Sequence, residues 1–412
     1  MQLAQSIWKK TALAACAAAL ALGSLSARAE TVYNLLSLSD FSGPFAAIMP
    51  SFGGAREAVV GWWNAEAGAK LGVKLVLKPY DTRYDAAQTA SLWPGILAET
   101  KPVIGFALGG PDTAALQQRL PQDKVPLILG AAANGFAWRP NQWVLTVRPT
   151  YVHETAGFIN WYHKTKLGGS RPAKVAMVTS EASPAYADMG KGLAAYAKAN
   201  PKVAEVVEII YAEPAPADLT LQVRRVVNAG ADFIVCTASI QQAVAVKRAL
   251  QALGKKTPVM LSMHNAPTFI AKQLGGIEAF EGDYEAQSGV ITSSEDTEAK
   301  RFYDMLAAKY GLKASWNSVT GAGIAQSLVL VRAIEAAAQK HGGAKLTGEI
   351  LYQTLTTTEF PAKLFFGYTH DLEFSVDAPF PSKAPKINIG TVSGGKVVTV
   401  ATGVPVPTLS KW

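Results

Sequence analysis

The feature that most constrains the fold is an alternation of short apolar runs with longer amphipathic stretches from residue 32 onward. Runs rich in Val, Ile and Leu fit strands, and stretches of about 10 to 15 residues between them fit helices, so the pattern predicts repeated βαβ units. The runs are almost continuously apolar, which is typical of parallel strands that helices cover on both faces. We expect strands at 32–38, 73–80, 103–108, 127–130 and 143–147, and a second series at 174–179, 205–211, 232–237 and 258–263.

The two series indicate two lobes, because 412 residues exceed the size of one ordinary domain. Pro149, between the two series, opposes a simple continuation of the chain, so we place the first crossing there. After residue 284 the pattern changes to helical stretches and then to a β-biased segment. The predicted fold class is α/β, with two doubly wound parallel-sheet lobes joined by crossover strands. Residues 30–149 and 284–360 would form lobe 1, and residues 150–283 and 361–412 would form lobe 2.

Residues 1–29 have the pattern of a signal peptide. Lys9 and Lys10 precede an apolar run at 11–25, and Ala27-Arg28-Ala29 offers the small-x-small pattern of a cleavage site. The run is shorter than the roughly 20 residues that a membrane-spanning helix needs, so we expect cleavage and a periplasmic protein. The alternative is a lipoprotein anchored through Cys16, which we favour less because the apolar run continues past that residue.

Composition excludes several functional classes. Apolar residues make up 49% and charged residues 17%, as in a globular protein. Loss of Lys9, Lys10 and Arg28 takes the net charge from +8 to +5 with scattered lysines, so we expect no nucleic-acid partner. Cys236 would remain as a single buried cysteine without a disulfide. The five histidines lack metal-ligand spacing, and no nucleotide or nucleophile motif is complete, so we expect no metal, no cofactor and no catalytic residues.

The loop SLSDFSGPFA, residues 37–46, follows the first strand and precedes a long helical pattern. Loops at the carboxyl ends of parallel strands face a common crevice, toward which the next helix directs free N–H groups. Ser39 and Ser42 add hydroxyls, and Phe41 and Phe45 could enclose an apolar body, so the loop could hold an acid. The structural alternative is a serine-capped helix start with two packing phenylalanines.

Several motifs, taken in order, resemble one family. SLSDFSGPFAAIM, GGAREAVVGWWNAEAG, VKLVLKPYDTRYDAAQTA and VIGFALGGPDTAALQQ come first, and PLILGAAANG, KVAMVTSEASPAYADMGKGL and GADFIVCTASIQQAVAVKRALQALGKKTPVML continue the order. Together they resemble the periplasmic substrate-binding proteins of the branched-chain amino acid (Leu/Ile/Val-binding) type that serve ABC transporters. The resemblance covers roughly residues 31–400 and implies the type I, Venus-flytrap fold, with a ligand trapped between closing lobes and no catalysis.

The resemblance also implies a site and partners. The implied ligand-binding residues are Ser39, Phe41, Ser42, Gly109, Gly110, Thr113, Ala132, Ala133, Asn134, Tyr186, Ser239, His264, Asn265 and Trp316. The implied partners are a small carboxylate or amino acid and a membrane permease, and we expect a monomer. A module that reports its ligand to a membrane sensor is the alternative class.

Departures from the family pattern bear on the ligand. Amino acid binders of this type usually have hydroxyl residues where Gly109, Gly110 and Ala133 stand, and commonly an acid near Met263 that meets the ammonium group. A buried ammonium group without a carboxylate partner would be costly. We therefore expect an organic acid with an aromatic or other apolar body, with hydrogen bonds from His264 and Asn265. Asp40 and Asp112 keep an amino acid ligand as the alternative, although Asp112 also fits a helix N-cap.

Overall fold

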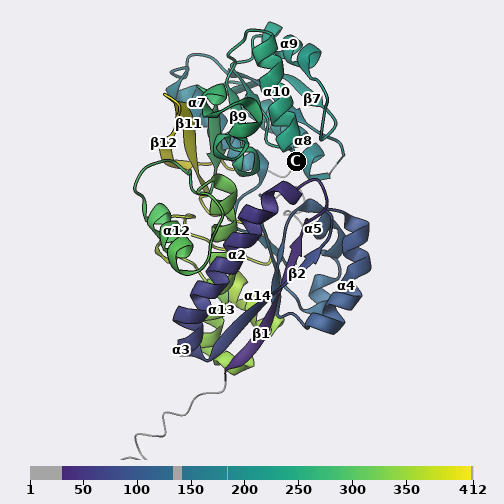
Figure 1. The fold of residues 1–412 in the computed structure, drawn as a ribbon. Coiled ribbons are helices and arrows are strands. Elements are labelled where there is room, and N and C mark those ends of the chain that lie inside the picture. Colours follow the sequence, from purple (N-terminus) through teal and green to yellow (C-terminus); the bar gives the residue numbers. More distant parts are fainter. Residues whose placement is uncertain (1–29, 133–141, 183, 410–411) are drawn as a thin grey trace, which may run out of the picture.

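Two mainly parallel sheets form the framework of the computed structural model, which describes residues 30–132, 142–182, 184–409 and 412. Each sheet belongs to one lobe, and the lobes stack end to end (Figure 1). The predicted α/β class with two parallel-sheet lobes is confirmed. The predicted signal peptide lies outside the described residues.

Lobe 1 is built on a five-stranded parallel sheet with the order β2-β1-β3-β4-β5. β3, β4 and β5 are buried along their whole length, because helices cover both faces of the sheet. Asp85 caps α4 by accepting a hydrogen bond from the Gln88 amide at 2.7 Å. The elements are β1 (Thr31–Ser39), η1 (Ala46–Ile48), α2 (Met49–Trp63), η2 (Asn64–Gly68), α3 (Ala69–Leu71), β2 (Val73–Asp81), α4 (Ala86–Thr100), β3 (Ile104–Ala107), α5 (Gly110–Leu116), α6 (Leu120–Asp123), β4 (Leu127–Leu129) and β5 (Val144–Thr146).

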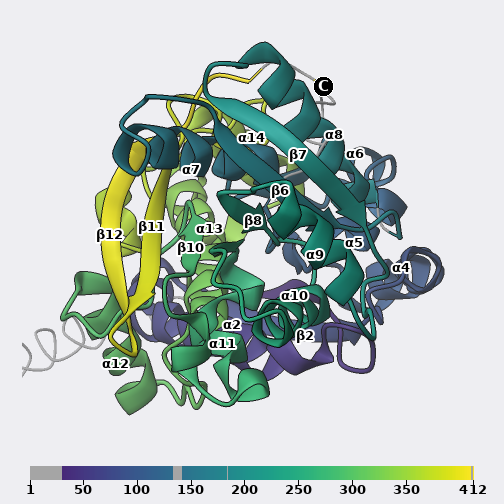
Figure 2. The same ribbon diagram turned by 90° about the horizontal axis from the view of Figure 1, so that it is seen from above.

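Lobe 2 contains a seven-stranded sheet with the order β12-β11-β10-β9-β8-β6-β7. β6, β7, β8, β9 and β10 are parallel. β11 and β12 add an antiparallel pair at one edge, drawn in yellow in Figure 2. Its first ten elements are α7 (Tyr151–Thr165), β6 (Ala173–Thr179), α8 (Pro184–Ala199), β7 (Ala204–Tyr211), α9 (Thr220–Asn228), β8 (Phe233–Val235), α10 (Ile240–Ala252), β9 (Val259–Leu261), η4 (Met263–Asn265) and α11 (Pro267–Ile270). η5 (Ala271–Leu274), η6 (Ile277–Phe280), β10 (Tyr284–Gln287), β11 (Lys386–Ser393) and β12 (Lys396–Pro405) complete it.

Between β10 and β11 the chain returns to lobe 1. There it forms α12 (Glu298–Lys309), α13 (Ser318–His341), η7 (Gly343–Lys345), α14 (Gly348–Thr357) and η8 (Ala362–Phe365). α13 packs along α2 and is capped by Asn317, which accepts from the Thr320 amide at 3.0 Å. Of the described helices it alone is long and apolar enough to cross a membrane, but it is mostly buried, as the core helix of lobe 1.

Three segments therefore connect the lobes, at 147–150, 288–297 and 375–385. The sequence-based division assigned 284–360 to lobe 1 and 361–412 to lobe 2. In the structure β10 pairs with β9 and β11 in the second sheet, whereas Phe365 and Phe374 lie in the core of lobe 1. By sheet and core membership, the second and third crossings follow Gln287 and Phe374.

Candidate ligand-binding site

A small cavity lies where the two lobes meet, at the carboxyl ends of the parallel strands. Its free volume is about 30 Å³, which is room for about two water molecules. We call it the inner cavity. Its lining is mostly apolar or aromatic and carries no Asp, Glu, Lys or Arg among the described residues: Phe45, Ile48, Phe52, Tyr84, Leu108, Gly110, Gly130, Ala131, Ala132, Tyr151, Ala185, Tyr186, Met263 and His264.

Tyr84 reaches the cavity from the loop that follows β2. Arg83 and Tyr84 have φ angles of 54° and 53°, a left-handed conformation that L-residues adopt at an energetic cost. The Tyr84 ring occupies the space beside Gly109, where a Cβ would lie 2.4 Å from the Tyr84 Cε2 atom. The Tyr84 hydroxyl faces the Gly110 amide. Gly109 is therefore required for the position of the Tyr84 ring.

Two tyrosines of lobe 2 complete this polar group. The Tyr186 hydroxyl, on α8, faces that of Tyr84, and the Tyr151 hydroxyl, at the start of α7, faces the Ala132 amide. Burial raises the pKa of Tyr84, Tyr151 and Tyr186 above the ordinary value for tyrosine. All three phenols therefore stay protonated at neutral pH and can donate hydrogen bonds to an anion or accept them from a donor.

His264 closes the lobe 2 side of the cavity. Its Nε2 atom lies 2.9 Å from the Ala238 carbonyl oxygen, and burial lowers the pKa of His264 to about 4. The ring is therefore neutral at pH 7. Because a carbonyl only accepts, Nε2 carries the proton and Nδ1 is left as an acceptor. The sequence led us to expect a hydrogen bond donated by His264 to the ligand. With Nε2 engaged by the Ala238 carbonyl, the free Nδ1 atom can instead accept from a ligand hydroxyl.

A buried guanidinium lies behind the lobe 1 side. Arg56 packs 4.7 Å from the ring of Phe52, which lines the cavity, and donates to Ser37 Oγ at 2.8 Å and Gln326 Oε1 at 3.0 Å. Gln326 in turn donates to the carbonyls of Ala107 and Ile128, so the pair joins the ends of β3 and β4. Burial lowers the pKa of Arg56 to about 9, which leaves it charged at neutral pH.

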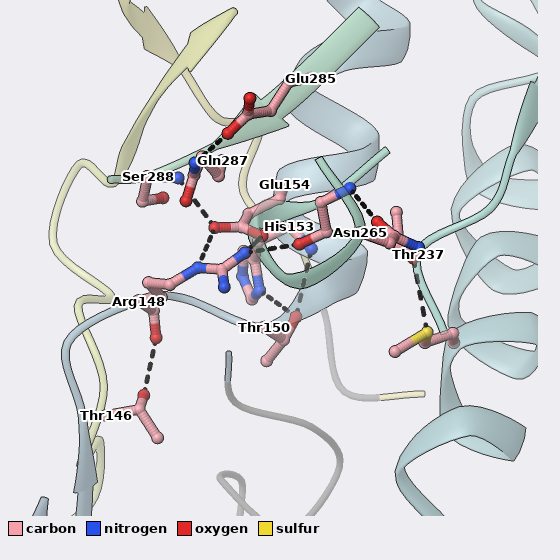
Figure 3. A network of polar contacts seen from close by, with 12 residues as sticks. Thr146, Arg148, Thr150, His153, Glu154, Thr237, Asn265, Glu285, Gln287 and Ser288 are labelled. Carbon is pink, nitrogen blue, oxygen red and sulfur yellow. Dashed lines mark hydrogen bonds and ion pairs between the residues drawn. The ribbon is translucent and has the colours of Figure 1, made fainter. Parts of the chain in front are cut away.

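A second buried guanidinium, that of Arg148, lies at the hinge (Figure 3). Its central carbon lies 5.5 Å from the centre of the Tyr151 ring. Arg148, on the first crossing, donates to Glu154 of α7 at 2.9 and 2.5 Å and to Ser262 Oγ at 2.9 Å. Glu154 also accepts from the amide of Ser288 on the second crossing at 2.8 Å. One charge pair therefore joins two crossings, α7 and the end of β9 at the pivot of the two lobes.

The structure distributes the residues that the sequence implicated. Gly110, Ala132, Tyr186 and His264 line the inner cavity. Ser239 and Tyr186 line a second, larger cavity toward the surface, which we call the outer cavity. Ala133 and Asn134 lie outside the described residues.

Six other implicated side chains are engaged elsewhere or point away. Ser39 is buried against Ser37, and Ser42 donates to Asp81 Oδ2 at 2.7 Å. Phe41 is 51% exposed. The remaining three side chains donate hydrogen bonds to backbone carbonyls. Thr113 donates to Gly109, Asn265 donates to Cys236 and Ser239, and Trp316 donates to Ser293.

Sequence reasoning missed Tyr84 and Tyr151. Their positions in the sequence could have indicated both. Tyr84 lies three residues after β2, at the crevice end of a parallel strand, and Tyr151 directly follows the first crossing. Phe45 belongs to the loop that was singled out, and it enters the cavity because Asp40 accepts the amides of Gly43 and Phe45, the latter at 2.7 Å, and so tightens the turn.

Comparison with known proteins agrees with this architecture. A family model described as periplasmic binding protein matches residues 34–373. No curated protein matched the chain. A solved branched-chain amino acid ABC transporter protein from Thermus thermophilus with bound valine is 19% identical, with a TM-score of 0.77, over 93% of this chain and 98% of that chain.

Two further solved structures have related folds. A fatty acid ABC transporter substrate-binding protein from Thermomonospora curvata is 20% identical, with a TM-score of 0.74, over 92% of this chain and 96% of its own. A solute-binding protein of an ABC transporter from R. palustris, in complex with 4-hydroxybenzoate, is 16% identical, with a TM-score of 0.71, over 93% and 99%. The resemblance predicted from the motifs is confirmed: the chain belongs to the periplasmic binding protein family, the solute-binding proteins of ABC transporters with the type I fold.

Proposed function

We propose that this protein captures a small carboxylic acid with an aromatic or other apolar body between its lobes and delivers it to an ABC permease of the inner membrane. The observation that carries the proposal is the lining of the inner cavity. Aromatic and aliphatic side chains surround neutral donors, namely the phenols of Tyr84 and Tyr151 and the amides of Gly110 and Ala132, and no carboxylate lies among the described lining residues.

An amino acid fits this lining less well. Its ammonium group would lose water without gaining a carboxylate partner. The two acids that kept this alternative open are engaged: Asp40 accepts from the Phe45 amide at 2.7 Å, and Asp112 accepts from the Leu108 amide at 2.8 Å and from Thr89 Oγ1 at 3.1 Å. The buried guanidinium of Arg56, one ring behind the lining and hydrogen-bonded to the neutral side chains of Ser37 and Gln326, favours a negative rather than a positive guest.

Capture requires the cleft to open. About 30 Å³ is too little for a ring and a carboxylate, so a ligand must separate the lobes or displace Tyr84 and Tyr186 from each other. The three crossings allow a hinge motion of this kind, and a ligand that touches both lobes would stabilise the closed form. The Tyr84 and Tyr151 hydroxyls facing the two amides mark where a carboxylate would be received.

The cellular setting extends this proposal. Family membership and the predicted signal peptide support a protein that is exported, acts as a monomer in the periplasm and has a permease as its partner. Among the solved relatives, one is named for fatty acids and one holds 4-hydroxybenzoate, which supports carboxylic acids as guests of this fold. Reporting to a membrane sensor is the alternative, and co-purification with a sensor kinase instead of a permease would favour it.

Ligand titration tests the proposal. Protein stripped of any guest by unfolding and refolding is titrated calorimetrically with benzoate, benzamide, benzylamine, succinate, leucine and valine. We expect heat and a raised melting temperature with benzoate, and neither with benzamide, benzylamine or the amino acids. Binding of leucine or valine without any binding of benzoate or succinate, the two acids that lack an ammonium group, would contradict the proposal.

Substitution of Tyr84 tests the site. Tyr84→Phe removes one donor to the carboxylate and should weaken benzoate binding by about tenfold to a hundredfold, since a hydrogen bond to a charged group contributes roughly 1.5 to 3 kcal/mol. The matched control is Tyr33→Phe, whose hydroxyl donates to Gly343 at 2.9 Å, remote from the cleft in lobe 1. Equal affinities for Tyr84→Phe and the unmodified protein would remove Tyr84 from the site.

A further inference from the structure

A second space continues the cleft toward the surface. The outer cavity has a free volume of about 290 Å³, against about 30 Å³ for the inner one. The two share Phe45, Tyr84 and Tyr186 as lining residues, so one layer of aromatic side chains separates them. Both lobes contribute to the outer cavity, with Pro44 and Pro111 from lobe 1 and Pro214 from lobe 2.

The chemistry of the outer cavity differs from that of a polar binding site. No Asp, Glu, Lys, Arg or His lies among its described lining residues. Three prolines, three aromatic rings and Ile240 give it a mainly apolar surface, and Gln241 and Gln273 are polar side chains at its exposed edge. The hydroxyl of Ser239 is engaged, because it donates to the Pro214 carbonyl at 2.5 Å and accepts from the Gln242 amide at 3.0 Å. Such a surface recognises hydrocarbon and offers no side chain of opposite charge to a second charged group.

The separating layer consists of side chains and can move. The rings of Phe45 and Tyr84 lie 4.4 Å apart at their centroids, and the Tyr84 hydroxyl faces that of Tyr186 across the lobes. No backbone strand or ion pair of the described residues bridges this layer. A guest whose carboxylate enters between the Gly110 amide and the Tyr84 hydroxyl, and accepts a hydrogen bond from each, would shift the ring and join the two spaces.

We propose that the guest is an elongated monocarboxylic acid, with its carboxylate in the inner cavity and an unbranched alkyl or aryl-alkyl tail in the outer cavity. This inference rests on the proposed function and specifies the substrate class of the same cleft. The combined space is close to the lower end of the volumes of ordinary ligand sites, about 300 Å³, which suits a tail of several carbons beyond the first ring or its equivalent.

A chain-length series tests the inference. Straight-chain carboxylates from butanoate to decanoate, and benzoate, 3-phenylpropanoate and 5-phenylpentanoate, are titrated below the concentrations at which they form micelles. Each added methylene that enters the outer cavity should tighten the Kd by about threefold to fourfold, until the tail reaches solvent. A Kd that stays flat or rises with length while benzoate binds would overturn the inference and leave the proposed function standing. No binding by any carboxylate would instead defeat the proposed function.

A blocking variant locates the tail. Ala215 is exposed and lines the outer cavity, so Ala215→Trp should fill the space without disturbing the core. We expect it to abolish the gain in affinity with chain length, so that octanoate binds no more tightly than butanoate. Ala217→Trp, an exposed position in the same loop that does not line the cavity, is the matched control and should keep the full gain. Length dependence that survives in Ala215→Trp would show that the tail lies elsewhere.

Discussion

At the scale of single residues, the cleft depends on one missing Cβ. Gly109 has an extended φ of −160°, so its backbone would accept any residue, but a Cβ would lie 2.4 Å from the Tyr84 ring. Gly109→Ala should therefore displace Tyr84 and weaken benzoate binding about tenfold or more while the fold persists, as checked by calorimetry and circular dichroism.

The control for this change is another glycine. Gly95 lies within α4 with nothing near its missing Cβ, so Gly95→Ala should leave binding unchanged and stabilise the helix by about 0.5 to 1 kcal/mol. Tight binding by Gly109→Ala would mean that the position of the Tyr84 ring does not matter to the guest.

Two phenylalanines of one loop make a second matched pair. Phe45 lines both cavities, whereas Phe41 is 51% exposed and lines neither. Phe45→Ala should weaken the binding of an aromatic acid about tenfold through lost apolar contact, and Phe41→Ala should change it less than twofold. Fluorescence titration of both variants measures this, and the reverse order would place the guest on the opposite side of the loop.

At the scale of elements, the apolar runs predict strand positions well. The expected runs at 73–80 and 174–179 correspond to Val73–Asp81 and Ala173–Thr179 in the structure. β10 was not predicted, because Tyr284-Glu285-Ala286-Gln287 carries two polar side chains that face the buried hinge. The contact between Tyr84 and Tyr186 was not predicted either, because a short-range sequence pattern cannot show that two residues from different lobes meet in space.

The hinge elements depend on the Arg148–Glu154 pair. Glu154→Gln would leave the buried guanidinium without its counter-charge, and removal of one partner from such a pair typically costs about 3 to 5 kcal/mol. We expect a loss of about 3 kcal/mol in urea unfolding. Glu208→Gln, which breaks a solvent-exposed pair with Arg225, should cost less than about 1 kcal/mol. If Glu154→Gln lost as little unfolding free energy as Glu208→Gln, the hinge pair would not be important for stability.

At the scale of the whole molecule, stability should depend on a buried acid at the hinge. Burial raises the pKa of Glu285 to about 7, with Gln287, Ser318 and Arg148 as its polar neighbours. Because the folded state holds this proton more tightly, the protonated carboxyl contributes stability that is fully present at pH values below its pKa in the unfolded chain. That contribution is lost as pH rises through the folded pKa of about 7. The pKa of His264, lowered to about 4, acts oppositely, since its contribution is lost as pH falls through 4.

A difference measurement isolates Glu285. Glu285→Gln keeps the shape and removes the titration, so its free energy of unfolding relative to the unmodified protein should rise between pH 5 and 8, while the histidine contributions cancel. Chemical denaturation at several pH values measures this. A flat difference for Glu285→Gln would show that this carboxyl does not titrate in the window.

The bridge of Arg56 and Gln326 has a thermodynamic consequence. Because it already holds the ends of three strands of lobe 1 together, through the carbonyls of Leu38, Ala107 and Ile128, that half of the cleft is preorganised before a guest arrives. The entropic penalty of association then falls on the motion of the other half and on the guest itself, so rigid guests should bind with the smaller penalty.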